Sequence, residues 1–138
     1  MDNHFRYTDD ELEALFESCQ LKLMYFNHEA HLRLACLRIK KYGTTWAIEN
    51  MTRRIHDYAT SLGAAKNHNH TVTVAAVKVV AHFMGRANED SFAELVIKFA
   101  RMKHQFKELL FSHYSIDIFN EEAARIQYLE PDLQPFDS

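Results

Sequence analysis

The chain has 138 residues, of which 47% are hydrophobic and 25% charged, a balance typical of a globular protein rather than a disordered or fibrous one. This length suffices for one compact domain and is too short for two ordinary ones, so we expect a single domain over residues 1–138. A formal net charge of -3 gives no electrostatic reason to expect nucleic acid or an anionic membrane as a partner.

The N-terminus and the cysteines indicate a cytoplasmic protein. Residues 1–6 lack the basic start and apolar stretch of a secretory signal, and no run approaches the roughly 18 apolar residues of a membrane span. Cys19 and Cys36 each lie inside an apolar helical pattern, where a small buried thiol is commoner than a disulfide.

The first two helices have clear start signals. Thr8 and Glu11 form a capping box, so a helix is predicted to begin after Thr8 and to end between residues 19 and 26. Asn27 is a good N-cap for a second helix, which we expect to run to about residue 41 and to be closed by Gly43.

Two further helices follow in the middle of the chain. Thr44 or Thr45 is expected to cap a third helix that ends at Gly63. Residues 71–84 are apolar almost all round; their β-branched side chains also permit a strand, but the length and spacing favour a central buried helix.

The C-terminal part is predicted to hold one long and one short helix. Asn88, Asp90 or Ser91 starts the long helix, whose apolar positions repeat at helical spacing to Leu110, with a bend indicated at Lys103. Asn120 is expected to cap a short helix through residue 128, and residues 1–7 and 131–138 to be flexible termini. The prediction is therefore an all-α, single-domain bundle of five or six helices.

Two histidines share one face of the second predicted helix. At roughly 100° per residue, His28 and His31 fall on an arc opposite the charged side chains, which is the face expected to be buried. The same arc also carries Leu32, Ala35, Ile39 and Tyr42. Buried imidazoles need a partner, which is a metal ion, a substrate or a neighbouring carbonyl group.

A second pair, His68 and His70, precedes the helix at 71–84. In an up-down-up bundle the starts of the second and fourth helices lie at the same end, so one of these histidines is expected to join His28 and His31. Three imidazoles with one open position form a typical catalytic metal site, here for a divalent ion such as zinc, iron or nickel.

The remaining histidines are expected elsewhere. His4 falls in the flexible N-terminus, and rotation arithmetic places His56 and His104 in solvent. His82 borders the apolar arc of its helix, and His113, near a helix end, is expected to hydrogen-bond a carbonyl group.

Hydroxyl and aromatic side chains beside the histidines are candidates for binding a substrate. Thr71 and Thr73 could orient a ligand next to His70, although a threonine at position 71 is more often a helix cap. Tyr42 lies on the histidine-bearing face, and exposed Trp46 is a candidate for a subunit contact. Unpaired N–H groups at both helix starts suit an anionic small molecule.

The segment Phe26-Asn27-His28-Glu29-Ala30-His31-Leu32-Arg33-Leu34-Ala35, with the later His70-Thr71-Val72-Thr73, resembles a set of small bacterial helical proteins. They combine F-[TN]-H-x-x-H-L-x-x-A with a later histidine-containing segment ending in T-x-T. The resemblance covers residues 26–84 and implies a shared site, without naming a reaction.

These patterns favour a mononuclear metal-dependent hydrolase or lyase that acts on a small anionic molecule, in a protein that forms a homodimer. The alternative is a non-enzymatic helical interaction module whose histidines are structural. Metal-free acid–base chemistry, or a carrier of haem or another small ligand with one axial histidine, also fits these residues.

Overall fold

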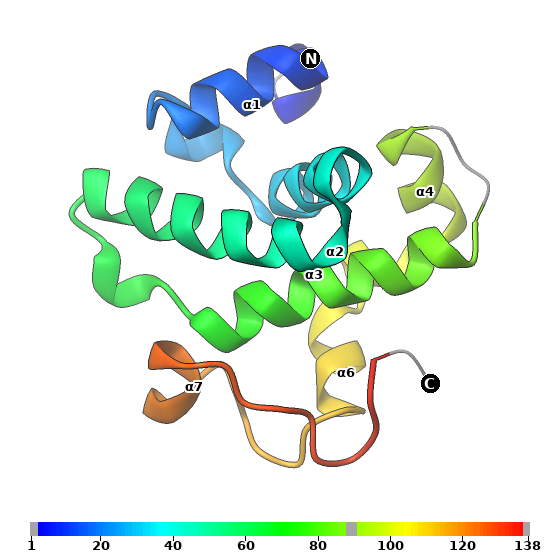
Figure 1. Ribbon diagram of the computed structural model, residues 1–138. Coiled ribbons are helices and arrows are strands. Elements are labelled where there is room, and N and C mark those ends of the chain that lie inside the picture. Colours follow the sequence, from blue (N-terminus) through cyan, green and yellow to red (C-terminus); the bar gives the residue numbers. More distant parts are fainter. Residues whose placement is uncertain (1–2, 88–90, 137–138) are drawn as a thin grey trace. The chain divides into compact units, whose positions relative to one another are not determined.

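The computed structural model describes residues 3–87 and 91–136 (Figure 1). Over these ranges the regular structure consists of 3-10 helices, labelled η, and α-helices, without any strand, so the all-α prediction is confirmed. The chain divides into two compact units, Met1–His68 and Asn69–Ser138, and each is described by itself. The single domain expected from the chain length stays a prediction.

Over residues 3–68, the first unit contains two α-helices and three short 3-10 helices. In chain order these are η1 (His4–Arg6), α1 (Asp9–Glu17), η2 (Leu23–Tyr25), α2 (His28–Ser61) and η3 (Ala65–Asn67). The predicted capping box at the start of α1 is confirmed, since Glu11 N–H donates to Thr8 Oγ1 and Thr8 N–H donates to Glu11 Oε1. These bonds satisfy N–H groups that have no partner inside the helix.

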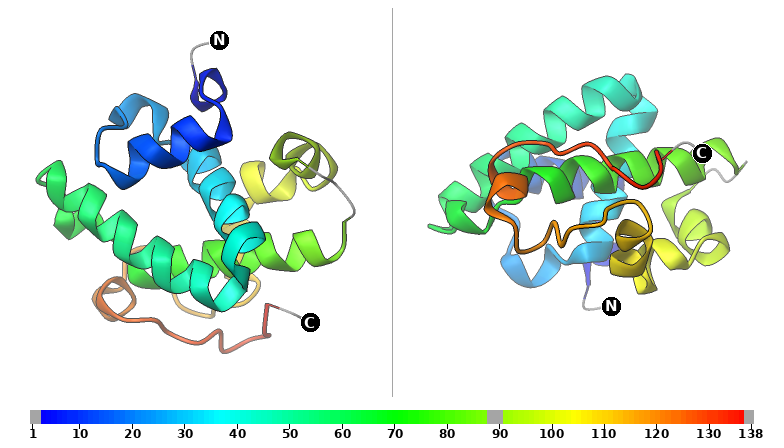
Figure 2. Two further views of the ribbon diagram at one scale, coloured as in Figure 1. Left: turned by 45° about the horizontal axis from the view of Figure 1, so that its top comes forward. Right: turned by 90° about the horizontal axis from the view of Figure 1, so that it is seen from below.

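A kink at Gly43 divides α2 into two halves that run in different directions (Figure 2). Gly43 has φ 81° and ψ 168°, a conformation that glycine adopts at little cost. The predicted helix break at this residue is therefore confirmed. Arg38 is fully buried beside the kink, where it donates to Asn50 of the second half and pairs with Glu17 of α1 at 2.9 Å.

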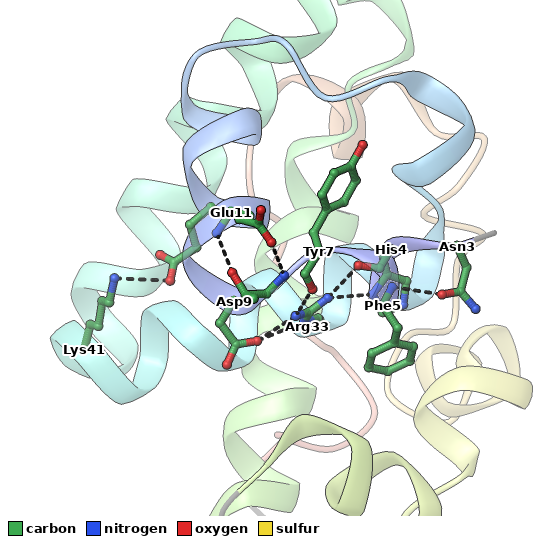
Figure 3. A network of polar contacts seen from close by, with 10 residues as sticks. Asn3, His4, Phe5, Tyr7, Asp9, Glu11, Arg33 and Lys41 are labelled. Atoms are coloured by element: carbon green, nitrogen blue, oxygen red, sulfur yellow. Dashed lines mark hydrogen bonds and ion pairs between the residues drawn. The ribbon is translucent and has the colours of Figure 1, made fainter. Parts of the chain in front are cut away.

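A polar network ties the N-terminal segment to α2 (Figure 3). Arg33 of α2 donates to the backbone oxygens of His4 and Tyr7, at 2.8 and 3.0 Å, and to Asp9 Oδ1 at 2.8 Å. His4 is fully buried, donates from Nε2 to Glu29 Oε1 at 2.7 Å, and accepts at Nδ1 from Arg33 at 3.2 Å. Residues 3–7 thus differ from the flexible terminus expected for residues 1–7, while residues 1 and 2 lie outside the described range.

The second unit begins with the long helix α3 and continues in shorter ones. They are α3 (His70–Gly85), α4 (Phe92–Lys98), α5 (Arg101–His104), α6 (Phe106–Phe111) and α7 (Glu122–Ile126). The helix predicted over residues 71–84 is confirmed as α3, which packs against α7. Its N-cap is Asn69, whose Oδ1 accepts from Val72 N–H, so the expectation that Thr71 is the cap was wrong.

The single long helix expected to reach residue 110 was also wrong. The backbone leaves helical geometry at Phe99 (φ -120°, ψ 60°) and at Gln105 (φ -130°, ψ 34°), which separates α4, α5 and α6. The Phe99 ring packs at 4.8 Å from the ring of Phe83. Ser91, one of the three predicted start residues, is the N-cap of α4. The other two, Asn88 and Asp90, lie outside the described residues.

The C-terminal segment folds back onto the end of α6. Leu133 N–H donates to His113 O at 2.9 Å, and Asp132 accepts hydrogen bonds from Ser115, which lower the pKa of its carboxyl group. Phe136 is buried. Residues 131–136 therefore differ from a flexible tail, residues 137 and 138 lie outside the described range, and α7 starts after Glu121 rather than after Asn120.

Each unit buries a tyrosine whose hydroxyl group is hydrogen-bonded to the backbone. Tyr58 in the first unit donates to Leu21 O at 2.6 Å, and Tyr114 in the second donates to Leu129 O at 2.8 Å, so both buried hydroxyls are satisfied. Cys19 and Cys36 are free thiols, as expected. Within residues 3–87 and 91–136, none of the helices combines the length and the hydrophobicity required to span a bilayer.

Candidate functional site

The start of α2 holds His28 and His31 one turn apart. Asn27 caps the helix as predicted, since its Oδ1 accepts from Ala30 N–H at 2.8 Å. This cap fixes the backbone of the first turn, and the two histidines therefore emerge from a rigid segment. The Phe26 ring lies 6.1 Å from the His31 ring, centroid to centroid, and forms an apolar neighbour.

His31 has a buried nitrogen atom without a hydrogen-bond partner. Its Nε2 is shielded from solvent, and no donor or acceptor of the described residues reaches it. Buried polar atoms are nearly always paired, because an unsatisfied one costs about 1–3 kcal/mol. An orphan imidazole nitrogen is therefore a specific feature that calls for an explanation.

Burial also keeps this imidazole neutral. Loss of hydration, followed by repulsion from His28 and then from His68, lowers the pKa of His31 from 6.5 to about 3. A neutral imidazole is the form that binds metal ions. A pKa this low makes His31 a poor general base near neutral pH, which disfavours the metal-free acid–base alternative at this residue.

His68 is the member of the second histidine pair that approaches His31 within the first unit. It follows η3, which packs against α2, and it is close enough to contribute to the lowered pKa of His31. Its ring also meets the ring of His56 edge-on, with 5.8 Å between the centroids. Four histidines of this unit, His28, His31, His56 and His68, thus form a chain of neighbours, which we call the histidine cluster.

His56 was missed as a member of the histidine cluster. Rotation arithmetic placed it in solvent, and its side chain is indeed exposed, but its ring still contacts His68. The sequence signal that bears on the position of His56 was the predicted helix break at Gly43. Because the chain changes direction at Gly43, a residue of the second half of α2 could not be placed by rotation arithmetic on the first half alone.

The histidine cluster is not a preassembled metal centre. Across the described ranges, no three or more histidine, cysteine, aspartate or glutamate side chains are arranged to hold a metal ion. A metal ion at His31 would therefore require neighbouring rings to turn toward it. His28 and His68 are the candidate further ligands, because both contribute to the lowered pKa of His31.

The other predicted site residues near α3 belong to the second unit. His70 is the first residue of α3, and Thr71 and Thr73 are buried within the helix. The Thr71 hydroxyl donates to Gln127 O at 2.7 Å and accepts from Leu129 N–H at 3.0 Å. These bonds give Thr71 a structural role, holding the segment after α7.

Tyr42 lies far along α2 from the histidines. It is 51% exposed and directly precedes the kink, about 16 Å from His31 along the helix axis at 1.5 Å per residue. The structure therefore does not bring Tyr42 to His31. Its neighbour across the kink, Trp46, is 64% exposed, in agreement with its expected position away from the apolar stripe.

Comparisons with protein-family models, with curated proteins and with solved structures find no match for this chain. The resemblance of residues 26–84 to small bacterial helical proteins stays a prediction.

Proposed function

We propose that the first unit binds one divalent transition-metal ion through His31, with His28 and His68 completing the set of protein ligands. The observation that carries this proposal is the buried Nε2 of His31, which has no hydrogen-bond partner in the described part of the chain. A metal ion would satisfy that nitrogen, and the neutral state of the ring favours coordination over protonation.

Zinc, iron and nickel are the ions that suit imidazole ligands. Three histidines would leave a fourth position on zinc open for water or substrate. The bound ion would then lower the pKa of that water and support hydrolytic or lyase chemistry on a small anionic molecule. Free thiols at Cys19 and Cys36 agree with the reducing cytoplasm in which we expect the protein to act.

A second candidate is a non-enzymatic interaction module with structural histidines. It is favoured by the exposed aromatic side chains of Tyr42 and Trp46, which flank the kink at Gly43. The homodimer predicted for this protein would use such a surface.

Metal titration of the full chain, purified without a nickel column, separates the two candidates. Wild-type protein should bind one equivalent of Zn²⁺ or Ni²⁺ by calorimetry, and His31→Gln should weaken binding by about tenfold or more. His28→Gln, at the half-buried first residue of the helix, serves as a second variant if His31→Gln is unstable. His104→Gln, an exposed histidine of α5, is the matched control and should bind as wild type.

Circular dichroism would verify that each variant keeps its helical content. Equal metal affinity in wild type and in both cluster variants would overturn the metal site. The absence of any stoichiometric binding would do the same, and would leave the interaction module as the function to test.

A further inference from the structure

The second unit contains a cavity whose lining includes no residue of the histidine cluster. Its volume is about 340 Å³, and its walls come from α3, from the start of α5, from the end of α6 and from the C-terminal segment. Ligand pockets for small molecules typically span roughly 300–1,000 Å³, so this one suits a small ligand. All of its lining residues belong to Asn69–Ser138.

The charged groups at this cavity are all of one sign. Arg86, just after α3, and Arg101, the first residue of α5, both line it, together with His82 and His113. No aspartate or glutamate of the described residues lines the cavity. Neither guanidinium group makes an ion pair or a side-chain hydrogen bond to any other described residue, and both side chains are exposed at the rim.

Two arginines without a carboxylate partner form a favourable environment for an anion. The planar guanidinium group donates two parallel hydrogen bonds to a phosphate or a carboxylate, and such charge-assisted bonds are the strong ones. The concave surface around them focuses the positive potential further. The cavity is therefore complementary to a negatively charged group.

The part of the cavity wall formed by Ser112, His113 and Gln134 is held in place by hydrogen bonds. His113 Nδ1 donates to Gln134 O at 2.8 Å, and Gln134 Nε2 donates to Ser112 O at 3.1 Å. Because a carbonyl oxygen only accepts, Nδ1 must carry the proton. Nε2 of His113 is then the ring nitrogen left to hydrogen-bond a ligand.

Aromatic rings give the cavity an apolar side. Phe136 is buried and packs against the His113 ring with 4.4 Å between centroids, and Phe83 lines the cavity from α3. A bare inorganic ion would leave these rings without a contact. A ligand with a short apolar body beside its charged group would cover them.

We propose that this cavity binds a small organic anion, whose phosphate or carboxylate group lies between Arg86 and Arg101 and whose apolar body packs on Phe83 and Phe136. The site uses no residue of the histidine cluster. Anion binding and metal binding can therefore succeed or fail independently.

The test is calorimetric titration of the full chain with phenyl phosphate, benzoate and inorganic phosphate, and with phenol as the neutral control. Phenyl phosphate or benzoate should bind with one-to-one stoichiometry, more tightly than inorganic phosphate, and phenol should not bind. Arg86→Gln and Arg101→Gln should each weaken binding by about tenfold or more, the loss expected for a hydrogen bond to a charged group.

Arg53→Gln is the matched control, because Arg53 is an exposed arginine of α2 in the other unit. It should bind the organic anions as wild type does. Unchanged affinity in both Arg86→Gln and Arg101→Gln, with helical content preserved by circular dichroism, would overturn the proposal. Inorganic phosphate binding as tightly as phenyl phosphate would overturn the assignment of an organic ligand, and no binding of any anion would overturn the site.

Discussion

The starts of α2 and α3 carry the same two-residue pattern, an asparagine cap followed by a histidine. Asn27 accepts from Ala30 N–H at 2.8 Å and Asn69 accepts from Val72 N–H at 3.0 Å, so the two helices begin with the same capping bond. A polar side chain in the first turn of each helix differs in its bonding. Thr71 of α3 uses its hydroxyl twice, whereas His31 of α2 has an Nε2 without a partner in the described residues.

This difference separates a structural polar group from a candidate binding group. The satisfied hydroxyl of Thr71 stabilises the fold, and its removal leaves two backbone groups without partners. The unsatisfied nitrogen of His31 adds no hydrogen bond to the metal-free fold and is available to a ligand. The following substitutions test the contrast, from the largest expected effect to the smallest.

Thr71→Val should be the most destabilising of these changes. It keeps the shape of the side chain but leaves Gln127 O and Leu129 N–H without the hydroxyl, so the free energy of unfolding should fall by about 3 kcal/mol. Urea denaturation measures the loss. Thr71→Ser retains the hydroxyl and should lose markedly less, and a Thr71→Val variant as stable as wild type would show that the hydroxyl is not structural.

Acid should destabilise the metal-free protein through His31. Its pKa is about 3 when folded and 6.5 when unfolded, so between these values the unfolded chain binds a proton that the folded chain excludes. The free energy of unfolding should therefore fall by about 1 kcal/mol for each pH unit below 6.5, and this contribution is fully retained above that pH. Comparing pH 7 with pH 5, His31→Phe should lose less stability than wild type does. Equal losses would argue against a buried neutral imidazole.

The two caps should respond differently to substitution. Asn27→Ala removes one capping bond and should cost about 1 kcal/mol, measured by urea denaturation. Asn69→Ala should cost more, because Asn69 Nδ2 also donates to Ile118 O at 2.8 Å. Aspartate provides the control, since it keeps the acceptor and loses the Nδ2 donor. Asn27→Asp should be close to neutral, whereas an Asn69→Asp variant as stable as wild type would show that the bond to Ile118 is unimportant.

His31→Phe should change stability least, by less than about 1 kcal/mol at pH 8. An apolar ring replaces an imidazole whose buried Nε2 makes no hydrogen bond, so no partner is left unsatisfied. The same variant should lose metal binding. A large loss of stability at pH 8 would show that His31 has a structural role like that of Thr71.

Most helix boundaries were predicted correctly where a short-range signal marks them. The capping box at Thr8, the cap at Asn27 and the break at Gly43 are all present in the structure. Each depends on residues within one turn of the backbone, so the chemistry is the same in the isolated segment and in the fold. The helix ends at Phe99 and Gln105 carry no such signal, and the apolar spacing continued across them.

The two candidate sites were predictable to different degrees. His28 and His31 stand out because their spacing puts them on one helix face, and His68 was one of two alternatives for a third member. The cavity between Arg86, Arg101 and His113 was not predicted, because these residues come from separate elements without a shared spacing. His4 and Phe136 were expected to lie in flexible termini, but both are buried. Their burial was not predicted for the same reason, because the residues that they contact are distant in sequence.

By itself, the sequence determined the helical class, the caps and the glycine break, because hydrogen bonding within one turn and the conformational range of glycine act over a few residues. Tertiary structure alone decided that His68 approaches His31, where the C-terminal segment folds and which arginines share a cavity. Those outcomes depend on packing between segments far apart in the chain, and residue spacing carries no information about such contacts.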